Sequence, residues 1–110
     1  SVKIDCRPSA DLLEAKPFLS FGSDTPVAPK LNRAGQLYVN GACYFTNTGK
    51  DSFPVCAKVI LKQDGRDTQF FNSTCIGNLQ PGTTPAEKEF TITWQSSSSG
   101  KYSLRYERFV

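Results

Sequence analysis

Hydrophobic and polar residues alternate along most of the second half of the chain. The clearest alternation runs through residues 87–94, and it returns in residues 53–63 and 101–109. Because successive side chains of a β-strand point to opposite faces, this period of two predicts strands with one buried face each. The large side chains that we expect in the core are Phe45, Phe90, Trp94, Tyr102 and Tyr106.

Turn-forming residues separate the alternating stretches. Asp64-Gly65 predicts a tight hairpin, and residues 79–82 form a Pro-Gly loop. Residues 36–47 are β-prone and end in a turn signal, Asn47-Thr48-Gly49, but they contain Asn40-Gly41. That pair leaves two alternatives open, a hairpin at this point or one continuous strand. Short strands at this spacing, with no helical stretch between them, predict a β-sandwich or a barrel.

The first third of the chain is less regular. Residues 12–22 predict one kinked strand, and residues 23–35 contain enough breakers to predict a crossing loop. Residues 1–9 are either a frayed leader or linker, or a strand held in place by Cys6. We expect residues 10–110 to form a single domain, because this length suits one compact unit.

The four cysteines Cys6, Cys43, Cys56 and Cys75 indicate the cellular compartment. Their number is even, no Cys-x-x-Cys pair occurs, and the chain has no histidine. Two disulfides are therefore favoured over free thiols or a zinc site. Disulfides persist in oxidising compartments, so we expect a secreted, periplasmic or cell-surface protein. The chain also lacks methionine, and we expect Ser1 to follow a processing event or an artificial boundary, with any export signal already removed.

The alternation also predicts which cysteines pair. Cys43 lies on the expected core face of its strand, and Cys75 shares the phase of Leu79, whose side chain should turn inward. Cys56 has the opposite phase and should face outward. Because a disulfide needs Cβ atoms about 4 Å apart, Cys43–Cys56 is disfavoured. We therefore predict Cys43–Cys75 in the core and Cys6–Cys56 on the outer face or edge of the sheet.

Composition and charge exclude several classes of function. Without histidine there is no Ser-His-Asp or Cys-His nucleophile system and no imidazole metal ligand. The net charge of +3 is small and scattered, and no run of eighteen apolar residues occurs, which argues against nucleic-acid binding and membrane insertion. The acidic residues form neither a recognisable catalytic pair nor a complete calcium loop. We predict no catalytic residues, no metal site and no cofactor, so an enzyme is not expected.

Several phenylalanines are candidates for the surface. Phe70 and Phe71 are adjacent in the strand expected over residues 67–75, so they cannot both point inward unless the strand bulges. Exposed aromatic rings near Lys and Arg mark contact sites for a protein or a surface glycan. The alternative is a bulge or a local cluster under a loop. The candidate contact residues are Phe53, Phe70, Phe71 and Phe109.

Short motifs occur in a recognisable order along the chain. They are Ala10-Asp11-Leu12-Leu13, Phe45–Gly49, Val59–Gly65, Leu79–Gly82, Phe90–Trp94 and Gly100–Arg105. Together they resemble the CARDB family (cell-adhesion-related domain in bacteria) over about residues 10–106. The resemblance implies an all-β fold, an immunoglobulin-like antiparallel β-sandwich of about seven strands. This chain departs from the family in its cysteines, which would staple the sandwich, and in ending before the family's further edge segment.

These expectations combine into a functional hypothesis. The protein is expected to be a non-catalytic extracellular or surface module for binding, adhesion or assembly, with a protein or glycan as its partner. One alternative is a secreted inhibitor or effector that presents loops, such as residues 23–35 or 76–86, to a protein partner. Another is an accessory domain of a larger secreted enzyme.

Overall fold

The computed structural model describes residues 1–8, 24–95 and 100–109, and within these ranges the protein is all-β. The expected strands over residues 36–47 and 53–63 are confirmed, whereas the expected loop over residues 23–35 contains two short strands. The expected strand over residues 12–22 and the motif at residues 10–13 lie outside the described residues. The strands are β1 (Val2–Pro8), β2 (Thr25–Val27), β3 (Lys30–Leu31), β4 (Gln36–Asn47), β5 (Phe53–Gln63), β6 (Arg66–Leu79), β7 (Ala86–Gln95) and β8 (Tyr102–Phe109).

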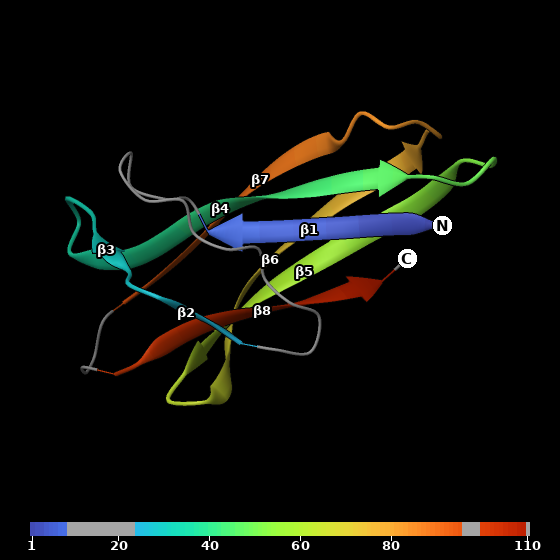
Figure 1. Ribbon diagram of the computed structural model, residues 1–110. Helices are drawn as coiled ribbons and strands as arrows, with labels where there is room; N and C mark the ends of the chain where they lie inside the picture. The colour runs from blue at the N-terminus through green and yellow to red at the C-terminus, as the bar shows by residue number, and fades with distance from the viewer. Residues whose placement is uncertain (9–23, 96–99, 110) are drawn as a thin grey trace.

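The strands form two four-stranded antiparallel sheets that lie one above the other (Figure 1). In the first sheet β4 is central, with β7 along one side and β1 and β3 along the other. In the second sheet the order is β2-β8-β5-β6. The start of β1 and the end of β8 lie close together: the Arg108 guanidinium donates a hydrogen bond to the Val2 carbonyl at 3.4 Å.

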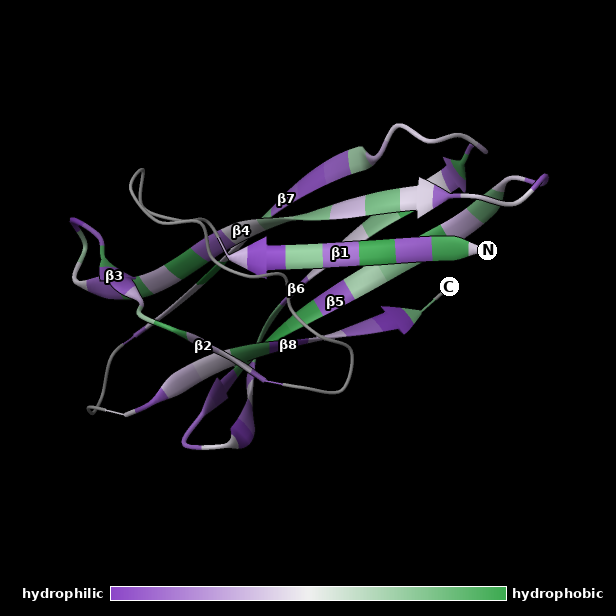
Figure 2. Cartoon of the chain, in the orientation of Figure 1, coloured by the Kyte–Doolittle hydropathy of each residue, from purple (hydrophilic) through white to green (hydrophobic). Residues whose placement is uncertain are grey.

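The core lies between the two sheets and takes every second side chain of the long strands. Figure 2 shows this alternation as green and purple bands along β1 and β4. Phe45, Leu61 and Leu104 are the largest fully buried side chains. Of the aromatic residues expected in the core, Phe45, Phe90, Trp94 and Tyr106 are buried, and Tyr102 packs against them while partly buried.

Two sequence signals for turns have different outcomes. Asp64 (φ 52°) and Gly65 (φ 81°) both have positive φ, as a tight β-hairpin requires, so this expected hairpin is confirmed. Asn40-Gly41 lies inside β4 instead. A Cβ atom at Gly41 would lie only 2.5 Å from the Phe90 ring and would also overlap a β1 carbonyl. The glycine is needed because neighbouring groups approach the backbone, not because the chain turns there.

The predicted disulfide pairing is wrong. The structure contains Cys6–Cys43, with Cα atoms 4.0 Å apart, and Cys56–Cys75, with Cα atoms 4.1 Å apart. Each bond joins residues directly opposite each other on neighbouring strands, β1 with β4 and β5 with β6. The first bond holds β1 against the centre of its sheet.

The physical reason for the error is a β-bulge near the end of β6. Phe53 pairs with Leu79 and Val55 pairs with Ile76, so between these two pairs β6 contains one residue more than β5. The extra residue reverses the phase, and Cys75 is exposed although Leu79 is buried. The outward position expected for Cys56 is confirmed by its register with Cys75, so the two outward cysteines meet.

Candidate functional site

Three of the four candidate contact residues are exposed. Phe71 is 50% exposed, Phe53 42% and Phe109 41%. Phe70 turns inward instead, and its ring centroid lies 6.5 Å from that of Trp94. Adjacent residues of β6 therefore point to opposite faces, as a regular strand requires.

Phe71 and Phe109 lie on the outer face of the second sheet. The pairing of β8, β5 and β6 places Phe109, Cys56 and Cys75 side by side in one row. The next row on the same face consists of polar side chains. In the row after that, Phe71 lies beside Ile60. We call this surface the aromatic face. It consists of Cys56, Lys58, Ile60, Phe71, Cys75 and Phe109.

The aromatic face has a small apolar layer of its own. Ile60 has the outward phase of β5, yet it is only 5% exposed, because it lies between Phe71 and Arg105 in its row. The Lys58 ammonium lies 4.2 Å from the centroid of the Phe71 ring, a cation–π contact. Phe71 is therefore in contact with Lys58 and lies beside Ile60, and these neighbours limit the orientations of its exposed ring.

Ion pairs border the aromatic face at one end. The Arg105 guanidinium donates to both carboxylate oxygens of Asp67, at 2.9 and 2.5 Å, and to Glu107 at 2.8 Å. These bonds lower the pKa of Asp67, chiefly through the hydrogen bond from Arg105, and they raise the pKa of Arg105. The border therefore carries fixed charges of both signs at neutral pH.

Phe53 is not part of this surface. It lies at the start of β5 opposite Leu79, and it has the phase of Val55, whose side chain points to the core. Its exposure comes from its place at the end of the strand, where the opposite sheet no longer covers it.

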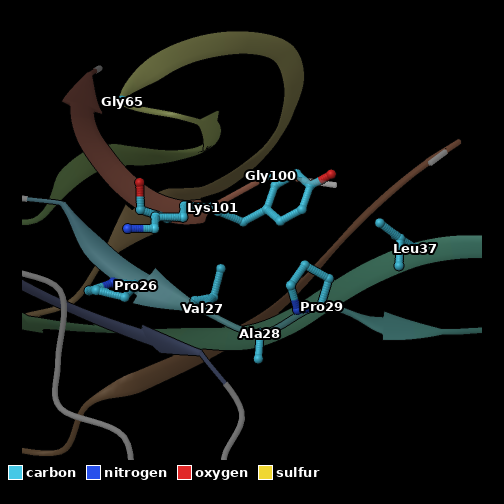
Figure 3. Close-up of a pocket in the computed structure, with 10 residues that line it drawn as sticks. Pro26, Val27, Ala28, Pro29, Leu37, Gly65, Gly100 and Lys101 are labelled. Atoms are coloured by element: carbon cyan, nitrogen blue, oxygen red, sulfur yellow. The ribbon is translucent and has the colours of Figure 1, made fainter. Parts of the chain in front are cut away.

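A shallow cleft opens at the end of the molecule near β2 (Figure 3). Its volume is about 630 Å³, within the range of small-molecule sites. In the sequence, the apolar run at residues 26–29 inside the expected loop was a signal that we did not use. The side chains in Figure 3 come from that run, from Leu37, and from Lys101 and the start of β8. The lining residues are Pro26, Val27, Ala28, Pro29, Leu37, Gly65, Gly100, Lys101, Tyr102 and Ser103.

The described part of the chain provides little for other chemistry. No group of three or more Cys, Asp or Glu side chains in residues 1–8, 24–95 and 100–109 is placed to hold a metal ion. Within the same ranges no helix is long and apolar enough to cross a bilayer. The two disulfides are typical of proteins that work in an oxidising, extracellular environment.

Comparisons with known proteins give no relative. No protein-family model matches the chain, and no curated protein and no solved structure is significantly similar to it.

Proposed function

We propose that this protein is a non-catalytic, extracellular or surface-exposed binding module of the immunoglobulin-like type, and that the aromatic face contacts a protein partner. One observation carries the proposal. Phe71 and Phe109 keep 50% and 41% of their surface exposed on one face of a sheet that is held by a disulfide and ion pairs. Aromatic side chains on a rigid support supply much contact area at low entropic cost, which is what binding hot spots require.

The immunoglobulin-like assignment is supported by the arrangement of the strands. Two antiparallel sheets enclose one core, and the long strands are divided between them, with β4 and β7 in one sheet and β5, β6 and β8 in the other. The CARDB-like order of motifs in the sequence, which implies such a sandwich, also supports the proposal. The extracellular assignment is supported by the two disulfides.

A protein partner is favoured over a glycan by the chemistry of the face. Phenylalanine offers no hydrogen-bonding group to a sugar hydroxyl, and the nearest cation, Lys58, is already engaged with the Phe71 ring. Arg105 is held by two carboxylates. An apolar centre beside mixed fixed charges is the usual composition of a protein–protein contact.

A site-specific cross-linking experiment tests the proposal. A photoreactive phenylalanine analogue at position 71 is exposed to extracellular proteins of the source organism, and the same analogue at Thr91, an exposed position on β7 of the other sheet, is the control. We expect a discrete adduct from position 71 alone, suppressed by excess unmodified protein.

Purified variants then decide whether the adduct reflects binding. With the captured protein as ligand, Phe71→Ser and Phe109→Ser should each weaken binding by about tenfold or more, as truncation of an anchor residue does. Both residues are exposed, so circular dichroism should show folded variants. Identical adducts from positions 71 and 91, or unchanged affinity in both variants, would contradict the proposal.

A loop-presenting effector is the second candidate, and one observation favours it. Leu31, in the segment between β2 and β4, is 67% exposed and is the most exposed of the large hydrophobic residues described. If this segment enters a partner's cleft, Leu31→Ser should abolish binding while Phe71→Ser leaves it unchanged. The same affinity measurements therefore separate the two candidates.

A further inference from the structure

The two disulfides differ sharply in their exposure to solvent. Cys6 and Cys43 are 0% exposed and belong to the core cluster between the sheets. Cys56 is half-buried and Cys75 is exposed, on the outer face of the second sheet. Thiol–disulfide exchange requires a thiolate to touch a sulfur atom, so only the second disulfide is open to a reductant while the protein stays folded.

We propose that Cys56–Cys75 is a site of reversible thiol–disulfide exchange with an external dithiol, and that the attacking thiolate reaches the Cys75 sulfur. The co-reactant is a small dithiol or the dithiol of a redox-active protein. This site goes beyond the binding role proposed above and does not depend on it.

The direction of attack follows from the order of side chains in the row. An attacking sulfur must approach along the axis of the S–S bond, opposite the leaving sulfur. Attack on Cys56 therefore comes from the side of β8, where Phe109 is its direct neighbour. Attack on Cys75 comes from beyond β6, which is the edge strand of its sheet in the part of the chain that the structure describes. Phe109 shields one sulfur, and the sheet edge leaves the other accessible.

The exchange is balanced in two steps. The first thiolate of the dithiol bonds to Cys75 Sγ, the Cys56–Cys75 bond breaks, and Cys56 leaves as a thiolate that takes up a proton. The second thiolate of the dithiol then attacks its partner sulfur in the mixed disulfide, and Cys75 leaves as a thiolate. The protein disulfide is reduced by two electrons, and the dithiol is oxidised to its own disulfide.

Reduction changes the aromatic face without dismantling the fold. β6 remains paired with β5 along most of its length, but the covalent link between the two strands is lost. Phe71 lies on the same strand, four residues before Cys75. Amide hydrogen exchange over residues 66–79 should therefore speed up in the reduced protein, while exchange in β4 stays unchanged.

Timed reduction tests the selectivity. The folded protein is treated with dithiothreitol, samples are alkylated, and the modified cysteines are identified by mass spectrometry. Cys56 and Cys75 should be alkylated at least about tenfold faster than Cys6 and Cys43. Low concentrations of urea should accelerate only the buried pair, because that pair reacts through opening of the fold. Equal rates for both pairs, or the need for urea at both, would overturn the proposal.

A monothiol tests the direction of attack. Glutathione followed by rapid alkylation should leave the glutathione adduct mainly on Cys75, by about fivefold or more over Cys56. In Phe109→Ala the share of adduct on Cys56 should rise, because the shielding ring is gone. Phe71→Ala, which removes another exposed ring from a different row, is the matched control and should leave the ratio unchanged. An equal distribution in the unmodified protein, or no effect of Phe109→Ala, would overturn the assigned attack on Cys75.

Discussion

Asn47 is the buried polar residue of the described core, and its side chain links the turn after β4 to the end of β6. It is 1% exposed and lies at the end of β4. Its Oδ1 accepts the Gly49 N–H at 2.9 Å, and its Nδ2 donates to the carbonyls of Asp51 at 2.7 Å and Leu79 at 2.9 Å. One amide thus holds the turn between β4 and β5 against the end of β6.

Asn47→Ala removes all three hydrogen bonds, and the loss can be estimated from their burial. The bond to Leu79 is buried, so its carbonyl is left without a partner, whereas the other two are part-buried and water replaces them in part. At about 0.5–1.5 kcal/mol for each bond and more for the buried carbonyl, we expect unfolding free energy to fall by about 2–4 kcal/mol. A typical domain has about 5–15 kcal/mol in total.

Asn47→Asp changes the hydrogen-bonding chemistry of the same side chain. The aspartate keeps an acceptor for the Gly49 N–H, but it turns a negative oxygen toward the two carbonyl oxygens that the amide group now serves. A buried carboxylate whose second oxygen faces two carbonyl oxygens and no donor is costly, so we expect Asn47→Asp to be at least as destabilising as Asn47→Ala at neutral pH.

Urea unfolding followed by the fluorescence of Trp94, the single tryptophan and 5% exposed, measures these changes. The control is Asn72→Ala. The Asn72 amide donates to the Thr91 carbonyl at 3.2 Å at an exposed site, so its removal should lower the free energy of unfolding by no more than about 1 kcal/mol. A loss below about 0.5 kcal/mol in Asn47→Ala, or a neutral Asn47→Asp, would refute the assigned hydrogen bonds.

Three further predictions follow from single positions. Gly41→Ala should cost about 3 kcal/mol in a thermal melt, because its Cβ would overlap the Phe90 ring, while Gly65→Ala, in open space at φ 81°, should cost only about 1 kcal/mol of backbone strain. Asp67, whose pKa is lowered by Arg105, should contribute stability above its unfolded-state pKa of about 4, and this contribution is lost as the pH falls through the lower folded-state pKa. The stability difference between the protein and Asp67→Asn should therefore shrink in acid, as urea melts at several pH values can check.

The alternation of side chains predicted most of the large buried residues, but not how the strands pair. It placed Phe45 and Trp94 in the core, and it predicted that Phe70 and Phe71 point to opposite faces unless the strand bulges, because these are local properties of one strand. The cysteine pairing failed because the phase of Cys75 was extended from Leu79 across a bulge that no local signal marks.

The aromatic face was predictable only in part, for a related reason. The exposure of Phe71 and Phe109 follows from strand phase and chain position, but their common face depends on the register of β8 against β5 and of β5 against β6. β5 and β8 are far apart in the chain and their register depends on the packing of the whole fold, whereas the register of the β5–β6 hairpin is shifted by bulges. Neither the row containing Phe109 nor the cleft near β2 could therefore be derived from spacing.

The two disulfides stabilise the fold by similar amounts, so their difference lies elsewhere. They close sequence separations of 37 and 19 residues, for Cys6–Cys43 and Cys56–Cys75. Chain-entropy reasoning gives about 3.8 and 3.2 kcal/mol, a gap well within the uncertainty of any single contact. What separates the bonds is position: Cys6–Cys43 fills the core, whereas Cys56–Cys75 occupies the face that also bears the exposed aromatic rings. A cross-link placed there provides comparable stability and, in addition, a covalent bond that the surroundings can reach.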